Sequence, residues 1–106
     1  MEYRNQETDA LFDAILALRT REECGNFLED ICTVKEILDM AQRFAVARML
    51  SEGKSYTEIT RQTGMSAATI SRVNRCLKYG TGGYQTALQR LGGEEDQKGE
   101  SQEDGK

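Results

Sequence analysis

Helix start signals recur along this chain and divide it into short helical segments. Three Ser or Thr residues are each followed three positions later by Glu, the spacing of a capping box: Thr20/Glu23, Thr33/Glu36 and Ser55/Glu58. Pro is absent, and the apolar residues between these points recur with helical spacing. No stretch alternates apolar and polar residues long enough to make a strand, so the sequence predicts an all-α fold.

The caps and the glycines between them predict six helices. The expected helices cover about residues 7–18, a second stretch beginning after Thr20, a third from Thr33 to a stop at Gly53, and then residues 56–62, the stretch from Ser66 to 79, and residues 84–91. Gly64 and Gly80 end the fourth and fifth helices, and a left-handed backbone is expected at Gly64.

The third predicted helix is apolar on nearly all sides over residues 44–50. A helix of this kind needs cover from several neighbours. A chain of 106 residues has few helices to supply that cover. An intertwined homodimer would supply it, and a tight monomeric core is the alternative; we expect the dimer.

Residue types and patterns that are missing from the chain argue against several classes of function. It contains no His, which excludes a His general base and a His-ligated metal. Its three cysteines (Cys24, Cys32 and Cys76) are widely spaced without a CxxC pair, which argues against a disulfide framework and a zinc site. Acidic pairs such as Glu36/Asp39 fall on solvated faces. We therefore expect no enzyme, no metal and no cofactor.

Hydropathy along the chain argues against a membrane or secreted protein. No apolar run approaches the roughly 20 residues of a membrane span. The first residues do not show the basic-then-apolar pattern of a secretory signal. We expect a cytoplasmic protein without a membrane partner.

The charge is unevenly distributed, although the chain as a whole carries a net charge of -4. Residues 54–91 hold six basic residues and one acidic residue, a net charge of +5. The segments before and after them are acidic, at -5 and -4. Because salt screens charges beyond about 8 Å, a basic segment can attract phosphate despite acidic flanks. The alternative is a solvated face with a chance asymmetry.

Residues 55–79 have the pattern of a helix-turn-helix. A short helix, a turn containing Gly64 and a second helix follow one another. Apolar residues occupy the positions that pack around such a turn: Ile59, Met65, Ile70 and Val73. A purely structural helical hairpin would share this pattern. The outward face of the second helix therefore has to distinguish such a hairpin from a DNA-binding one.

That outward face suits a DNA groove. At about 100° per residue, Ile70, Val73 and Leu77 cluster on one side of the second helix. Small residues at its start permit close approach to base edges, and its arginines can reach bases or phosphates. The amino ends of both helices offer free amides to phosphate. The candidate DNA-binding residues are Lys54, Tyr56, Thr57, Ser66, Ala67, Ala68, Ser71, Arg72 and Arg75.

The stretch Ala68-Thr69-Ile70-Ser71-Arg72-Val73-Asn74-Arg75, followed by Leu77-Lys78-Tyr79-Gly80, resembles the Trp repressor superfamily. The similarity is to its YerC/YecD branch of TrpR-related proteins and covers about residues 8–91. It implies a six-helix Trp-repressor-like fold with a helix-turn-helix. It also implies an intertwined dimer with a DNA-reading head at each end.

The resemblance also implies an effector pocket. In the founding member tryptophan binds between two arginines, whose positions match Arg43 and Arg72, beside a helix cap that matches Thr33. Val73 stands where that repressor has Gly and the indole needs space, and Cys76 replaces a Ser that contacts the ligand. We therefore expect no tryptophan-like corepressor. Arg72 has two competing roles, groove contact or remnant pocket, and groove contact is favoured.

We thus expect residues 1–91 to form one helical dimerisation and DNA-binding domain. Residues 92–106 are expected to be an acidic, disordered tail, native or a cloning remnant. The predicted function is a sequence-specific transcriptional regulator, a repressor by resemblance, that binds double-stranded DNA as a homodimer. The alternative is a helix-turn-helix that docks on an acidic protein partner.

Overall fold

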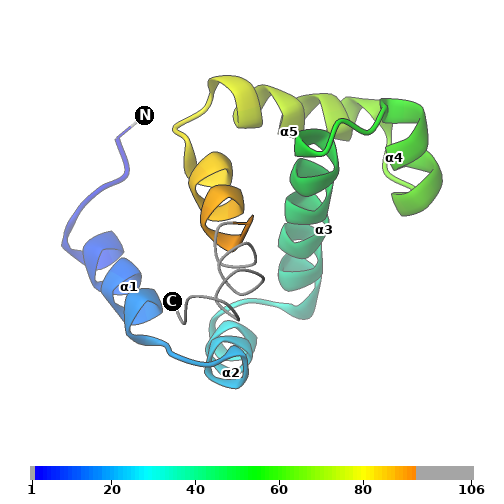
Figure 1. Ribbon diagram of the computed structural model, residues 1–106. Coiled ribbons are helices and arrows are strands. Elements are labelled where there is room, and N and C mark those ends of the chain that lie inside the picture. The colour runs from blue at the N-terminus through cyan, green and yellow to red at the C-terminus, as the bar shows by residue number, and fades with distance from the viewer. Residues whose placement is uncertain (1, 93–106) are drawn as a thin grey trace, which may run out of the picture. The chain divides into compact units, whose positions relative to one another are not determined.

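The computed structural model describes residues 2–92, and these residues form helices joined by short connections (Figure 1). The helices are α1 (Gln6–Ala17), α2 (Arg21–Ile31), α3 (Val34–Ser51), α4 (Tyr56–Thr63) and α5 (Ala67–Tyr79). Residues 83–92 form a sixth helical segment. The six predicted helices are confirmed, with ends that differ from prediction by one or two residues. The predicted acidic tail lies outside the described residues from position 93 onward.

The Ser or Thr half of each predicted capping box forms, and the reciprocal bond from the cap N–H to the Glu carboxylate forms at Thr33/Glu36 but not at the other two pairs. Each cap oxygen accepts a hydrogen bond from the backbone N–H three residues later, at 3.0 Å for Thr20/Glu23, 3.0 Å for Thr33/Glu36 and 3.1 Å for Ser55/Glu58. These bonds satisfy amides that the first turn of a helix leaves without a backbone partner. The helix starts are therefore determined by contacts between residues close in sequence, which is why sequence alone located them.

The chain divides into two compact units, one up to Asp39 and one from Met40 onward. The first unit holds α1, α2 and the start of α3, and no side chain of α1 or α2 is buried. Several large apolar side chains of this unit are exposed in the single chain, among them Leu16 at 79% and Leu38 at 59%. Within residues 2–92, the apolar side chains of this unit are therefore only partly covered.

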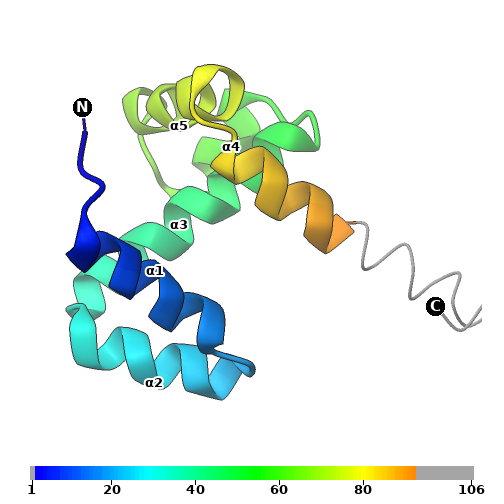
Figure 2. The same cartoon turned by 90° about the vertical axis from the view of Figure 1, so that its left-hand side faces the viewer.

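The buried core lies in the second unit. It joins Val46 and Ala47 of α3, Ile59 of α4, and Ile70 and Val73 of α5. Partly buried residues pack around it: Met49, Leu50, Met65, Tyr84 and Leu88. In Figure 1 and Figure 2, α5 lies across the C-terminal end of α3. The apolar second half of α3 thus packs against α4 and α5 and holds them in place.

The last helical segment is attached to α3 and α5 by specific contacts. The rings of Phe44 and Tyr84 stack with centroids 6.4 Å apart and planes 28° from parallel. Gln85 Nε2 donates to the carbonyl oxygen of Leu77 at 2.6 Å. α5 ends where the N–H of Gly80 bonds the carbonyl oxygen of Cys76 at 2.9 Å. Residues 83–92 therefore brace the end of the helix that carries the predicted DNA-binding face.

Candidate nucleic-acid interface

The two helices of the predicted helix-turn-helix, α4 and α5, pack on a shared apolar side. Ile59 and Ile70 are fully buried, and Val73 and Leu77 lie on the same buried side of α5. Burying a branched side chain of this size contributes about 1.5–3 kcal/mol. The side of α5 that sequence periodicity predicted to be buried is confirmed, and this fixes which side faces away from the core.

The turn between α4 and α5 is closed by local hydrogen bonds. Thr63 Oγ1 donates to the carbonyl oxygen of Ile59 at 2.8 Å and accepts from the N–H of Met65 at 3.1 Å. Gly64 adopts φ 77° and ψ 3°, the left-handed conformation predicted for it. Only Gly reaches this region without a steric penalty. The turn sets the direction of α5 relative to α4.

The start of α5 is capped and open to solvent. Ser66 Oγ accepts from the N–H of Thr69 at 3.2 Å. Ala67 and Ala68 follow directly and are exposed. Their small side chains leave the amino end of the helix accessible, as an approach to base edges in a major groove requires.

Every predicted DNA-binding side chain is on the surface of the single chain. The exposed residues are Lys54, Tyr56, Thr57, Ser66, Ala67, Ala68, Ser71, Arg72 and Arg75. Within residues 2–92 the salt bridges are Lys35–Asp39 and Arg61–Glu58, so Arg72 and Arg75 make none there. Both guanidinium groups are thus available to an anionic partner. The contact of each residue with DNA stays a prediction.

A groove joins the exposed sides of the two helices. It is lined by Tyr56, Thr57, Thr60 and Arg61 of α4 and by Ala67 of α5, and its volume is about 470 Å³. We call it the α4–α5 groove. Three of its residues were predicted from the sequence to bind DNA, whereas Thr60 and Arg61 were not. Their spacing of four from Tyr56 and Thr57 places them on the same helix face and was the signal available.

Arg61 is held by an acidic neighbour on its own helix. Its Nη2 lies 2.5 Å from Oε2 of Glu58, and Gln62 Nε2 donates to the same oxygen. The hydrogen bond from Arg61, followed by that from Gln62, keeps the pKa of Glu58 below its ordinary value. The same bond raises the pKa of Arg61. Both groups therefore remain charged in neutral solution.

The residues that the resemblance assigned to an effector pocket lie in different local settings. Thr33 belongs to the first unit and directly precedes α3. Its Oγ1 accepts a hydrogen bond from the N–H of Glu36. Arg43 and Arg72 are exposed. Val73 is only 2% exposed and belongs to the buried core. Val73 is therefore a core residue, and its exclusion of an indole stays a prediction.

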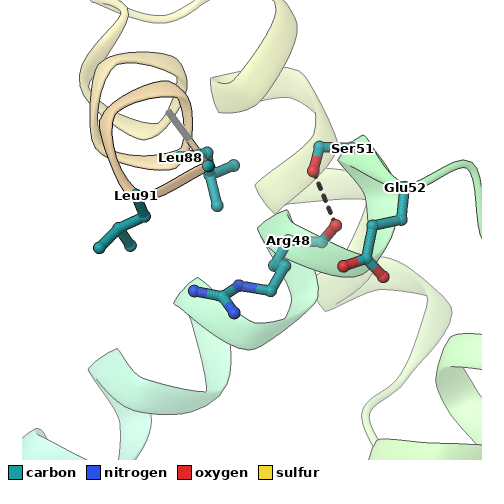
Figure 3. Close-up of a pocket in the computed structure, with 6 residues that line it drawn as sticks. Arg48, Ser51, Glu52, Leu88 and Leu91 are labelled. Atoms are coloured by element: carbon teal, nitrogen blue, oxygen red, sulfur yellow. Dashed lines mark hydrogen bonds between the residues drawn. The ribbon is translucent and has the colours of Figure 1, made fainter. Parts of the chain in front are cut away.

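Two further cavities lie in the second unit. One, of about 490 Å³, is lined by Phe44, Cys76, Gly80, Thr81, Gly83, Tyr84 and Ala87. The other, of about 140 Å³, lies between the end of α3 and residues 83–92 (Figure 3). Ser51 Oγ there donates to the carbonyl oxygen of Arg48 at 2.7 Å, so the hydroxyl is occupied. Neither cavity contains a predicted DNA-binding residue.

Two further properties of residues 2–92 concern metals and membranes. These residues bring together no group of three or more His, Cys, Asp or Glu side chains that could hold a metal. None of their helices combines the length and the apolar character that crossing a membrane demands.

Comparison with known proteins gives the chain its family. A family model described as "Trp repressor protein" matches residues 6–92. The chain belongs to the Trp repressor family. A relative within it is the uncharacterized protein YerC of Bacillus subtilis (strain 168), which is 53% identical over 88 residues, 83% of this chain and 85% of YerC. The resemblance read from the sequence is confirmed.

Solved structures of the family have the same fold. A TrpR-like protein from Eubacterium eligens ATCC 27750 superposes with a TM-score of 0.81 at 50% identity, covering 84% of this chain and 92% of that one. A candidate Trp repressor from Staphylococcus aureus gives a TM-score of 0.80 at 47% identity, covering 84% and 89%. The predicted all-α, Trp-repressor-like fold is confirmed. The family is one of DNA-binding regulators rather than enzymes.

Proposed function

We propose that this protein is a sequence-specific transcriptional regulator that binds double-stranded DNA as a homodimer through α4 and α5. The observation that carries the proposal is the exposed side of α5. Ser71, Arg72 and Arg75 lie there, opposite a buried side made by Ile70 and Val73. A helix that is apolar on the protein side and basic on the other matches the recognition helix of a DNA-binding head.

In this proposal α5 contacts the bases and the start of α4 contacts the phosphate backbone. Ala67 and Ala68 are small enough for the start of α5 to approach base edges, while Ser71 can hydrogen-bond them. Arg72 and Arg75 reach bases or phosphates from the next turns. Lys54, Tyr56 and Thr57, at the start of α4, are placed for the phosphate backbone, because the amino end of a helix attracts anions.

The exposed apolar surface of the first unit supports a homodimer. Leu16, Ile31, Val34 and Leu38 are each more than half exposed in the single chain. Monomeric proteins rarely leave such surfaces uncovered. A second copy of the chain would cover them and provide a second recognition helix. Two heads of this kind bind half-sites about one helical turn of DNA apart, so the site should have two-fold symmetry.

We infer that tryptophan does not control this regulator. Val73 is part of the buried core, so a ligand ring has no free space at that position. Addition of L-tryptophan should leave the affinity for DNA unchanged in an anisotropy titration; a tenfold increase would contradict this inference. The family name supports repression of transcription rather than activation. A bacterial regulator of this kind works in the cytoplasm.

The decisive experiment is selection of bound duplexes from a random pool with the purified protein. A two-fold symmetric motif is expected. Arg72→Ala with Arg75→Ala should then abolish binding to that motif and leave helical content unchanged. The matched control, Arg21→Ala with Arg90→Ala, removes the same charge from exposed arginines outside α4 and α5. Equal losses in both double variants would contradict the assigned face.

The selection also separates the proposal from a protein-docking hairpin. A protein that uses α4 and α5 to bind an acidic partner would select no duplex sequence. It would lose DNA to competition by any polyanion at equal charge concentration. A duplex of the selected motif that competes far better than scrambled DNA supports the regulator; equal competition contradicts it.

A further inference from the structure

Glu58 behaves differently from the other glutamates at capping positions. The carboxylate of Glu36 accepts from the N–H of Thr33 at 2.8 Å, and that of Glu23 accepts from the N–H of Arg19 at 2.8 Å. Both thus turn back to the backbone before their helix. Within residues 2–92, the carboxylate of Glu58 instead accepts hydrogen bonds from residues later in the helix, Arg61 and Gln62.

The position of this ion pair is unusual in a basic segment. Glu58 is the only acidic residue between positions 54 and 91. Its partner Arg61 lines the α4–α5 groove together with Tyr56, Thr57 and Ala67, three predicted DNA-binding residues. The carboxylate therefore neutralises an arginine on the side of the helix-turn-helix that would face DNA.

We propose that Arg61 is a phosphate-contacting residue of this interface and that Glu58 is its positioning residue, holding the guanidinium until a DNA phosphate replaces the carboxylate. This inference rests on the proposed DNA-binding function. It adds Arg61 to the residues predicted from the sequence to contact DNA. It also makes the Glu58 carboxylate a competitor that weakens binding of Arg61 to any phosphate.

The exchange is energetically feasible. The Arg61 side chain is 69% exposed, and that of Glu58 is 33% exposed. Exposed ion pairs are weak because water and salt screen them. A guanidinium can instead form two parallel hydrogen bonds to one phosphate. Transfer of Arg61 from Glu58 to phosphate therefore exchanges one charge-assisted bond for another, and Glu58 becomes hydrated.

The experiment is a double-mutant cycle on the full-length protein, with salt titrations of its selected duplex. The variants are Glu58→Gln, Arg61→Gln and the two combined. Arg61→Gln should lower the slope of log K against log salt concentration by about 1 per protomer, the amount expected for one lost phosphate contact. Arg61→Lys, which keeps the charge, should preserve the slope. Glu58→Gln should raise affinity on the order of twofold to fivefold per protomer, the range that exposed ion pairs span.

The combined variant identifies the cause. If Glu58 acts through Arg61, the gain from Glu58→Gln disappears when position 61 is Gln. Asp39→Asn is the matched control, because it removes the carboxylate of the Lys35–Asp39 pair on α3. It should leave affinity and slope unchanged.

Three results would overturn the inference while leaving the proposed function intact. They are an unchanged slope in Arg61→Gln, a gain from Glu58→Gln that persists in the combined variant, and an equal gain from Asp39→Asn. Failure of the unaltered protein to bind any selected duplex would instead refute the proposed function. Helical content and midpoints of urea unfolding, measured for each variant, separate these results from loss of fold.

Discussion

The carbonyl oxygen of Cys76 occupies the space that a side chain on Gly80 would need. A Cβ added to Gly80 would lie 2.5 Å from that oxygen, although the backbone φ of -83° is open to any residue. The oxygen belongs to the backbone of α5, which cannot move without disturbing the helix. Gly80 is therefore required by close approach and not by a left-handed conformation.

Gly80→Ala should destabilise the protein by about 1–3 kcal/mol, because overpacking forces the backbone to shift. Urea unfolding followed by circular dichroism measures this difference. Gly83→Ala is the control, since a Cβ there has no atom within 4 Å. Comparable losses at both positions would show that glycine flexibility, and not the approach to Cys76, is responsible.

Gly64→Ala should cost about 1–2 kcal/mol, for a different reason. Its φ of 77° is left-handed, and a Cβ there would meet no atom within 4 Å. The cost is therefore backbone strain alone. Gly64→Asn should lose less than Gly64→Ala, because Asn tolerates the left-handed region better. An alanine variant as stable as the unaltered protein in urea unfolding would contradict this account.

Ser66 should show separate effects on stability and on DNA binding. Ser66→Ala removes the oxygen that caps α5 and should cost about 1 kcal/mol. Ser66→Asp keeps a capping oxygen and should retain stability, but it places a negative charge at the end of α5 predicted to approach DNA. Thermal unfolding and anisotropy measure the two effects. An aspartate variant with unchanged DNA affinity would place Ser66 outside the interface.

The ion pair of Glu58 predicts a dependence of stability on pH. Because Arg61 and Gln62 hold the pKa of Glu58 below the ordinary 4.5, the stabilisation is fully present above that pH. It is lost as the pH falls through the lowered pKa, when the carboxylate takes up a proton. Urea midpoints measured from pH 6 to pH 3 should fall less steeply for Glu58→Gln than for the unaltered protein. Parallel curves would show that the pair contributes nothing to folding.

The helix boundaries and the buried side of α5 were predictable because they depend on neighbours in sequence. A cap such as Ser55 meets the N–H of a residue three positions on, whatever the rest of the fold does. Ile70, Val73 and Leu77 recur with the helical period, so they had to share a side. The predicted DNA-binding residues Ser71, Arg72 and Arg75 of α5 are exposed for the same reason, since they fall on the opposite side of that helix.

The α4–α5 groove could not be foreseen in full. Arg61 has the right spacing from Thr57, but a groove needs a second wall, and Ala67 provides it only after the turn at Gly64 has set the direction of α5. The hydrogen-bond partner of the Glu58 carboxylate could not be predicted either. Its spacing allows a bond to the backbone before α4 or to Arg61, and the sequence does not rank the two.

The sequence by itself determined the all-helical fold, the caps, the left-handed turn at Gly64 and the basic outward side of α5, because each follows from spacing along one helix or one turn. Tertiary structure alone decided that Val46 and Ala47 of α3 share a core with Ile59 and Ile70, and that Arg61 lines a groove beside Ala67. These two facts depend on how helices are brought together in space, and contact between residues distant in sequence is not a property of any local pattern.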